Sequence, residues 1–142
     1  MSYPGGYTGA CLCGAIQFRI DAELEPIQIC HCSQCRRAQG SAFAANSPVA
    51  ETAFVLLAGS DRLKEYESSA GKLRVFCDGC GSPVFSRNLR TPGVLRVRAG
   101  LINEPLRVRP VAHFYVASKA DWWEIGDGCQ QFEAGYVPGQ KR

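Results

Sequence analysis

The sequence has no long apolar run, and its first residues, MSYPGGYTGACLCG, contain none either. We therefore expect neither a signal peptide nor a membrane span, and a cytoplasmic location is the default expectation. Internal repeats, low-complexity segments and linkers are also missing. The 142 residues are thus expected to form a single domain over 1–142, with one substantial core.

The sequence also lacks a large excess of either positive or negative charge. The formal net charge is only +3, and no Lys/Arg stripe runs along the chain. A nucleic-acid partner is therefore not expected, although a small anionic ligand is compatible with this charge. The composition, with 46% hydrophobic and 20% charged residues, is that of a globular protein rather than a disordered one.

Helical periodicity is rare, and short strands are predicted instead. In AIQFRI, alternation directs Ile16, Phe18 and Ile20 to one face, and Gly- or Pro-containing turn signals separate the other apolar runs. The predicted strands cover residues 15–20, 53–58, 73–77, 94–100 and 111–116. This pattern predicts an all-β protein of small antiparallel sheets.

One or two short helices accompany the predicted strands. The first covers about residues 33–39, with Ser33 as its N-cap and Gly40 as its stop. A second helical turn is expected over residues 118–125, again opened by a serine.

Cysteine is the residue that the sequence has in abundance, with eight among 142 residues. Without an export signal, a disulfide framework has no oxidising context, and short spacings favour metal ligands instead. An iron–sulfur cluster remains an alternative to zinc. The thiols occur as Cys11-x-Cys13, Cys30-x-Cys32-x-x-Cys35 and Cys77-x-x-Cys80, with Cys129 alone and expected to pack rather than ligate.

Two of these groups can supply a closed four-thiolate zinc site. In a strand, Cys11 and Cys13 would point to the same face, with their positions about 6.5–7 Å apart. The sequence CDGC at 77–80 is typical of a metal knuckle, in which a strand ends at Cys77 and a turn returns Cys80 beside it. Cys11, Cys13, Cys77 and Cys80 are therefore the predicted structural zinc ligands.

The remaining group, Cys30, Cys32 and Cys35, is one ligand short of a tetrahedral set. A catalytic zinc has three protein ligands and an open fourth position, so these thiols are the predicted catalytic zinc site. Another pairing that leaves a spare thiol remains an alternative. His31 would point to the opposite face of an extended Cys-His-Cys segment and is expected to pack rather than to ligate.

Two arginines follow the third thiol directly. On a short helix, Arg36 and Arg37 diverge by about 100°, so only one of them would face the site. That one is a candidate for binding a substrate carboxylate, and the alternative is two solvated surface charges.

Four stretches resemble the successive motifs of the glutathione-dependent formaldehyde-activating (GFA) family, to which a domain of centromere protein V is related. They are GACLCGAIQF, CHCSQCRRAQGSAF, FCDGCGSPVF and HFYVASKADWWEIGDGCQQFE, and the resemblance covers about residues 9–133. It implies a β-tent fold stapled by two zinc ions, with the same division of ligands. The occupancy of the second site and the oligomeric state stay open.

The resemblance implies a carbon–sulfur lyase or synthase that joins glutathione, or a similar thiol, to a small aldehyde such as formaldehyde. A three-thiolate zinc suits this chemistry because it exchanges thiols readily. The alternative is a non-catalytic module that binds or senses zinc or thiols. A chromatin-binding role is disfavoured by the weak positive charge.

Overall fold

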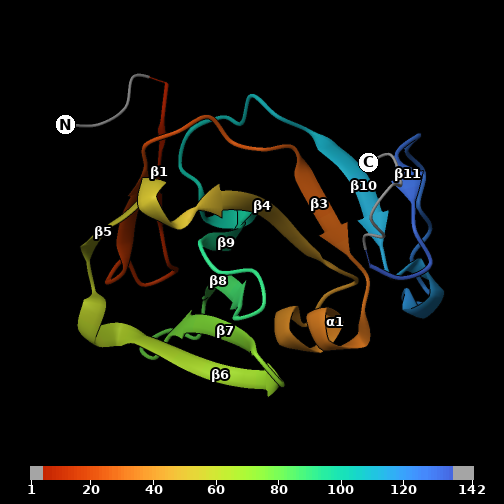
Figure 1. Cartoon of the computed structure of the whole chain (residues 1–142), viewed down its shortest axis with the longest axis horizontal. Coiled ribbons are helices and arrows are strands. Elements are labelled where there is room, and N and C mark those ends of the chain that lie inside the picture. The colour runs from red at the N-terminus through yellow and green to blue at the C-terminus, as the bar shows by residue number, and fades with distance from the viewer. Residues whose placement is uncertain (1–4, 136–142) are drawn as a thin grey trace.

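A computed structural model describes residues 5–135, and within them the chain is mostly β-strand with one α-helix (Figure 1). The predicted strands correspond to β2, β5, β7, β9 and β10, so the all-β prediction is confirmed. The strands are β1 Tyr7–Ala10, β2 Gln17–Ile20, β3 Ile27–Cys30, β4 Ala44–Ala50, β5 Phe54–Ala58, β6 Leu63–Ser69, β7 Lys72–Cys77, β8 Pro83–Asn88, β9 Val94–Arg98, β10 Pro110–Phe114 and β11 Gln130–Gln131.

These strands form two sheets of unequal size. The smaller sheet has the order β1-β2-β5, and the larger has the order β11-β10-β3-β4-β9-β8-β7-β6. Most pairings are antiparallel as predicted, but β10 runs parallel to both β3 and β11, which the sequence pattern did not predict. Parallel pairing requires a connection that returns the chain to the starting end of the sheet, and the long chain path between β3 and β10 provides it.

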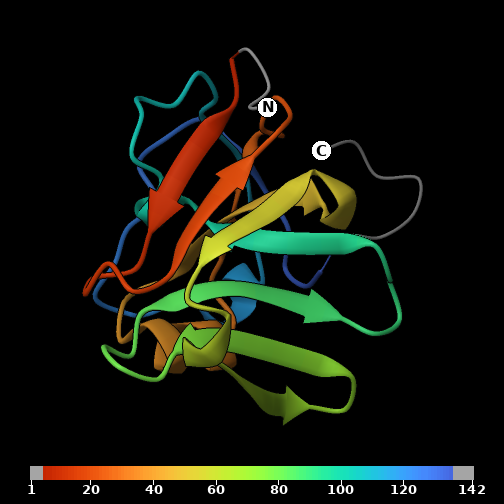
Figure 2. The ribbon, with the colours of Figure 1, turned by 90° about the vertical axis from the view of Figure 1, so that its left-hand side faces the viewer.

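The main core lies where the two sheets meet. Figure 2 shows β1 and β2 running steeply across the nearly horizontal strands of the larger sheet. The three residues predicted to face inward, Ile16, Phe18 and Ile20, are all 0% exposed, and the Phe18 ring stacks on Phe54 with the ring centroids 4.9 Å apart. The alternation in AIQFRI therefore correctly predicts the buried face of β2.

The helix α1 covers Ser33–Gln39 and ends at Gly40 in the left-handed conformation, as predicted. Its N-cap is Cys32 rather than Ser33, because the Cys32 sulfur accepts a hydrogen bond from the Cys35 backbone N–H at 3.2 Å. None of the helices among residues 5–135 combines the length and the apolar character needed to cross a membrane.

The helical turn predicted over residues 118–125 is wrong in position. A single 3-10 turn, Val116–Ser118, ends where the helix was expected to begin. The preceding Tyr115 has a left-handed φ of 59°, and its N–H donates to the Ala134 carbonyl. Lys119 Nζ binds the Trp123 carbonyl at 2.7 Å, which holds the following segment as an open loop.

Candidate metal centres and the adjoining basic cavity

The structure brings Cys11, Cys13, Cys77 and Cys80 together, with their sulfur atoms all within 4.8 Å of one another. Cys77 is the last residue of β7, and Cys80 returns beside it in a turn, as the knuckle pattern predicts. The conformation expected for the first pair is wrong. Cys11 and Cys13 follow β1 in a turn closed by the Gly14 N–H, which brings their sulfur atoms to 3.6 Å.

The spacing of these sulfur atoms fits a tetrahedral zinc ion. Zinc–sulfur bonds of about 2.3 Å in tetrahedral geometry separate the sulfur atoms by about 3.8 Å. The Sγ atoms of Cys13 and Cys77 lie 3.8 Å apart. Ser82 supports the cluster, because its hydroxyl lies 3.3 Å from the Cys80 sulfur, and this contact, together with backbone hydrogen bonds from Ser82 and Cys13, lowers the pKa of that thiol to about 5. A thiol that ionises readily is a ready zinc ligand.

The structure also brings Cys30, Cys32 and Cys35 together, again with all sulfur atoms within 4.8 Å of one another. Cys30 ends strand β3, Cys32 caps α1, and Cys35 lies in the first turn of that helix. Strand, cap and helix thus direct three thiols to one point. This cluster contains no fourth cysteine, histidine or carboxylate among the described residues.

The three thiols share one favoured site for negative charge. Hydrogen bonds from Cys30 and Cys32 lower the pKa of Cys35 far below its usual range, and the Arg74 guanidinium lowers it further. Both terminal nitrogens of Arg74 lie 3.7 Å from the Cys35 sulfur. Hydrogen bonds with Cys32 and Cys35 raise the pKa of Cys30, so negative charge within the group is favoured on Cys35.

His31 points away from the thiols, as predicted, and is completely buried. Its Nε2 hydrogen-bonds Nδ1 of His113 at 2.8 Å, and His113 Nε2 hydrogen-bonds the Asp127 carboxylate at 3.0 Å. The His31 N–H donates to the Phe114 carbonyl, which fixes the backbone between Cys30 and Cys32. These hydrogen bonds hold the segment that carries Cys30 and Cys32 in place. The side chains of His31, His113 and Asp127 are not part of the three-thiol cluster.

A third group of potential donors lies at the far end of this chain of side chains. His113, Asp127 and Cys129 place one donor atom each within 4.8 Å of one another. Each already has a protein partner, because Asp127 accepts from His113 and the Cys129 thiol donates to the Pro110 carbonyl at 3.2 Å. These contacts account for all three residues as packing and hydrogen-bonding groups.

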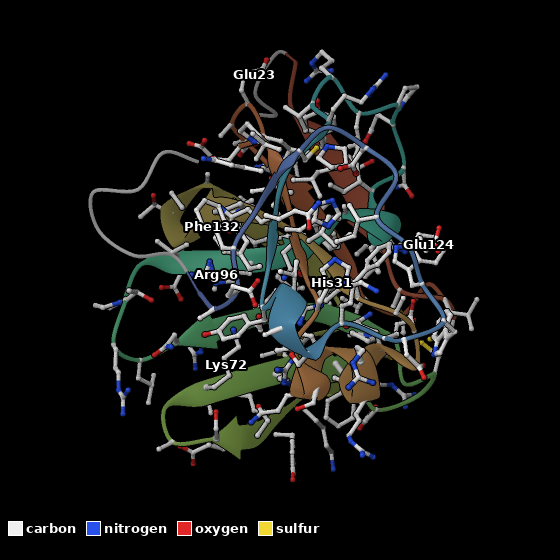
Figure 3. The ribbon with its side chains drawn as sticks, turned by 90° about the vertical axis from the view of Figure 1, so that its right-hand side faces the viewer. Glu23, His31, Lys72, Arg96, Glu124 and Phe132 are labelled. Carbon is white, nitrogen blue, oxygen red and sulfur yellow. The ribbon has the colours of Figure 1, made fainter. Side chains whose placement is uncertain are left out.

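A cavity of about 580 Å³ opens beside the three thiols. Figure 3 shows Lys72 and Arg96, two of its lining residues, on the same side of the molecule. The cations that line it, which we call the basic cavity residues, are Lys72, Arg74, Arg90 and Arg96. Phe114 and Tyr115 also line the cavity, and Tyr115 does so in a left-handed conformation that is rare for a bulky residue.

Strand register explains how the cations meet. Arg74 on β7 lies opposite Ser86 on β8, and Ser86 lies opposite Arg96 on β9, so the three side chains share one face of the larger sheet. Alternation adds Lys72 and Arg98 to that face. Burial lowers the pKa of Lys72 to about 8, and repulsion from Arg96 and Arg74 lowers it in the same direction.

The two arginines predicted to bind substrate lie elsewhere. Arg36 donates its Nε–H to the Ser118 carbonyl at 3.1 Å, Arg37 is exposed, and neither lines the cavity. A role for either in substrate binding stays a prediction. The sequence signal nearest to the lining cations is the i, i+2 spacing of Lys72 and Arg74 and of Arg96 and Arg98, at or beside two predicted strands, although Arg98 itself does not line the cavity.

Comparisons with known proteins agree with this architecture. The sequence model of the glutathione-dependent formaldehyde-activating enzyme family matches residues 6–118. An uncharacterized lyase from Schizosaccharomyces pombe is 32% identical over 131 residues, covering 92% of this chain and 93% of that protein. A crystal structure of a Rhodobacter sphaeroides protein superposes with a TM-score of 0.60 at 21% identity, covering 73% of this chain and 99% of the other.

The fold and the two cysteine clusters define an all-β protein with sites compatible with zinc. The chain belongs to the glutathione-dependent formaldehyde-activating enzyme family, because the family match covers most of its length.

Proposed function

We propose that this protein is a zinc-dependent carbon–sulfur lyase or synthase that joins a thiol, glutathione or a similar one, to a small aldehyde such as formaldehyde. The observation that carries the proposal is a three-thiol set, one donor short of a tetrahedron, facing a cavity of about 580 Å³. Family membership and the lyase name of the yeast relative support the reaction class.

Each of the two cysteine clusters is proposed to bind its own zinc ion, one structural and one catalytic. Cys11, Cys13, Cys77 and Cys80 would hold a structural ion, since four thiolates close its coordination sphere. Cys30, Cys32 and Cys35 would hold the catalytic ion and leave room for one more ligand. When bound there, zinc supplies the positive charge that lowers the pKa of an incoming thiol.

The residues of the chain bind and orient the two reactants. The cations of the cavity hold the anionic groups of the thiol, and Arg74 holds them close to the thiols because its guanidinium contacts Cys35. The substrate thiol releases its proton to solvent, its sulfur attacks the carbonyl carbon, and a carbon–sulfur bond forms as the π bond of the carbonyl opens. The resulting alkoxide takes a proton from solvent and becomes a hydroxyl. The reverse reaction breaks the same bond and returns thiol and aldehyde. Proximity and orientation supply the acceleration.

Exchange NMR on labelled formaldehyde and glutathione tests the proposal with zinc-loaded protein. We expect the protein to accelerate exchange between free and thiol-bound formaldehyde, and we expect Cys32→Ser to abolish that acceleration. Cys129→Ser is the matched control, because Cys129 lies outside both cysteine clusters. Equal exchange with wild type and a folded Cys32→Ser protein would contradict the proposal. Glutathione binding without acceleration would favour the non-catalytic binding module.

A further inference from the structure

The basic cavity has an unusual balance of charge. Its lining contains four cationic side chains, Lys72, Arg74, Arg90 and Arg96, and no Asp or Glu among the described residues. In Figure 3 the labelled carboxylates Glu23 and Glu124 lie away from Lys72 and Arg96. Cations in a partly enclosed space without carboxylates indicate a site for an anion.

Partners within the protein do not neutralise these cations. Arg74 is 9% exposed, and its polar contacts are the Ser68 hydroxyl at 2.9 Å and the Cys35 sulfur. Arg98, which lies on the same face of the sheet but outside the lining, is 4% exposed and bonds only neutral groups, among them the Gln39 and Asn46 side-chain oxygens. Within the described part of the chain, neither these arginines nor Lys72 and Arg96 form an ion pair with a carboxylate.

The thiols themselves cannot balance this charge. If Cys30, Cys32 and Cys35 held a divalent zinc ion as thiolates, the group would carry one net negative charge, 3 − 2 = 1, and a substrate thiolate would add one more. Four lining cations therefore leave two positive charges, 4 − 2 = 2, for the rest of the substrate to neutralise. An ammonium group on the substrate would add positive charge and find no carboxylate in the lining.

We propose that this site prefers a thiol that is a small polyanion, with at least two negative groups besides its sulfur, over a thiol that also carries an ammonium group. This inference rests on the proposed function, because it takes the cavity beside Cys30, Cys32 and Cys35 as the substrate site. Glutathione carries two carboxylates but also an ammonium, so the same peptide with a blocked amine fits the cavity better.

The spacing of the cations suits two separated anionic groups. Adjacent strands lie about 4.8 Å apart, so Arg74 on β7 and Arg96 on β9, with β8 between them, are separated by about 10 Å at the backbone. Lys72 lies two residues from Arg74 on the same face, about 7 Å along β7. One anion can thus bind beside Arg74 near the thiols, and a second can bind between Lys72 and Arg96.

Calorimetric titration of zinc-loaded protein with a matched pair of thiols tests the inference. N-acetylglutathione and glutathione differ only in the blocked amine, and we expect the acetylated peptide to bind about tenfold more tightly. Mercaptosuccinate and 2-mercaptoethyl phosphate, which both lack an amine, should bind more tightly than cysteamine, which carries only an amine. Their order distinguishes carboxylate from phosphate as the preferred anion. Glutathione binding as tightly as its acetylated form would overturn the inference.

Variants then locate the preference in the cavity. Arg96→Gln should remove most of the tenfold preference, and Lys72→Gln provides a second test if that variant fails to fold. Lys64→Gln, an exposed position on β6 outside the lining, removes the same charge and should retain the preference. If both cavity variants behave like Lys64→Gln, the inference is wrong.

Turnover separates this inference from the proposed function. A preference for N-acetylglutathione without accelerated formaldehyde exchange would contradict the proposed reaction and support the polyanion site. Faster exchange with glutathione than with N-acetylglutathione would support the reaction and contradict the polyanion site.

Discussion

Replacing Cys13 by serine should remove the part of the fold's stability that the structural zinc ion supplies. Cys13 is exposed, so its side chain contributes little packing, and the substitution changes the metal cluster rather than the core. A metal ion held by Cys13 and Cys77 closes a loop between positions 64 residues apart. For a cross-link of that span, the lost entropy of the unfolded chain corresponds to about 4 kcal/mol. That is a large fraction of the stability of a typical domain, about 5–15 kcal/mol.

The assay is urea unfolding at fixed free zinc and again with a chelator. Zinc should stabilise the wild type by about 4 kcal/mol more than it stabilises the Cys13→Ser protein, in which only the second cluster can still bind zinc. With chelator present, the two proteins should differ by less than about 0.5 kcal/mol. Cys129→Ser should respond to zinc as the wild type does, because Cys129 is outside the cluster. If zinc stabilised wild type and Cys13→Ser equally, the assignment of a structural site would be refuted.

Three further predictions concern the scaffold. Gly9→Ala should lower the free energy of unfolding by about 2–3 kcal/mol, because a Cβ at this position would overlap the Phe18 ring. Thermal unfolding tests this, and an unchanged melting temperature would contradict the prediction. His113→Phe should lower the free energy of unfolding by about 2 kcal/mol in urea, because the buried His31 ring would lose its hydrogen bond to His113; equal midpoints would refute this. The Glu104 carboxylate accepts from the Thr8 N–H at 2.7 Å, which lowers its pKa below 4.5. The stability that wild type gains over Glu104→Gln should therefore be full above pH 4.5 and decline as the pH falls below it.

The sequence predicted the cysteine clusters because ligand spacing is a local property. The CDGC knuckle and the strand–helix junction at residues 30–35 each bring their thiols together within a few residues. The local conformation of Cys11 and Cys13 was harder to predict. Gly14, with φ of 80°, closes a turn there, and this turn replaces the expected strand geometry.

The basic cavity could not be predicted in the same way. Lys72-x-Arg74 and Arg96-x-Arg98 each look like the solvated face of an ordinary strand. They form one surface only because β8 pairs with both strands and places Ser86 between Arg74 and Arg96. Such register depends on pairing between residues far apart in the sequence. Arg36 and Arg37, in contrast, were predicted to bind substrate only because they directly follow Cys35 in the sequence.

The central claim, that Cys30, Cys32 and Cys35 hold a metal ion with a position open to a thiol, is tested most directly by cadmium-113 NMR of the substituted protein. The account predicts two resonances, one for each cysteine cluster, of which only one shifts when N-acetylglutathione is added. The shifting resonance should be the one lost in Cys35→Ser. A single resonance, or two resonances that both ignore the thiol, would contradict the claim.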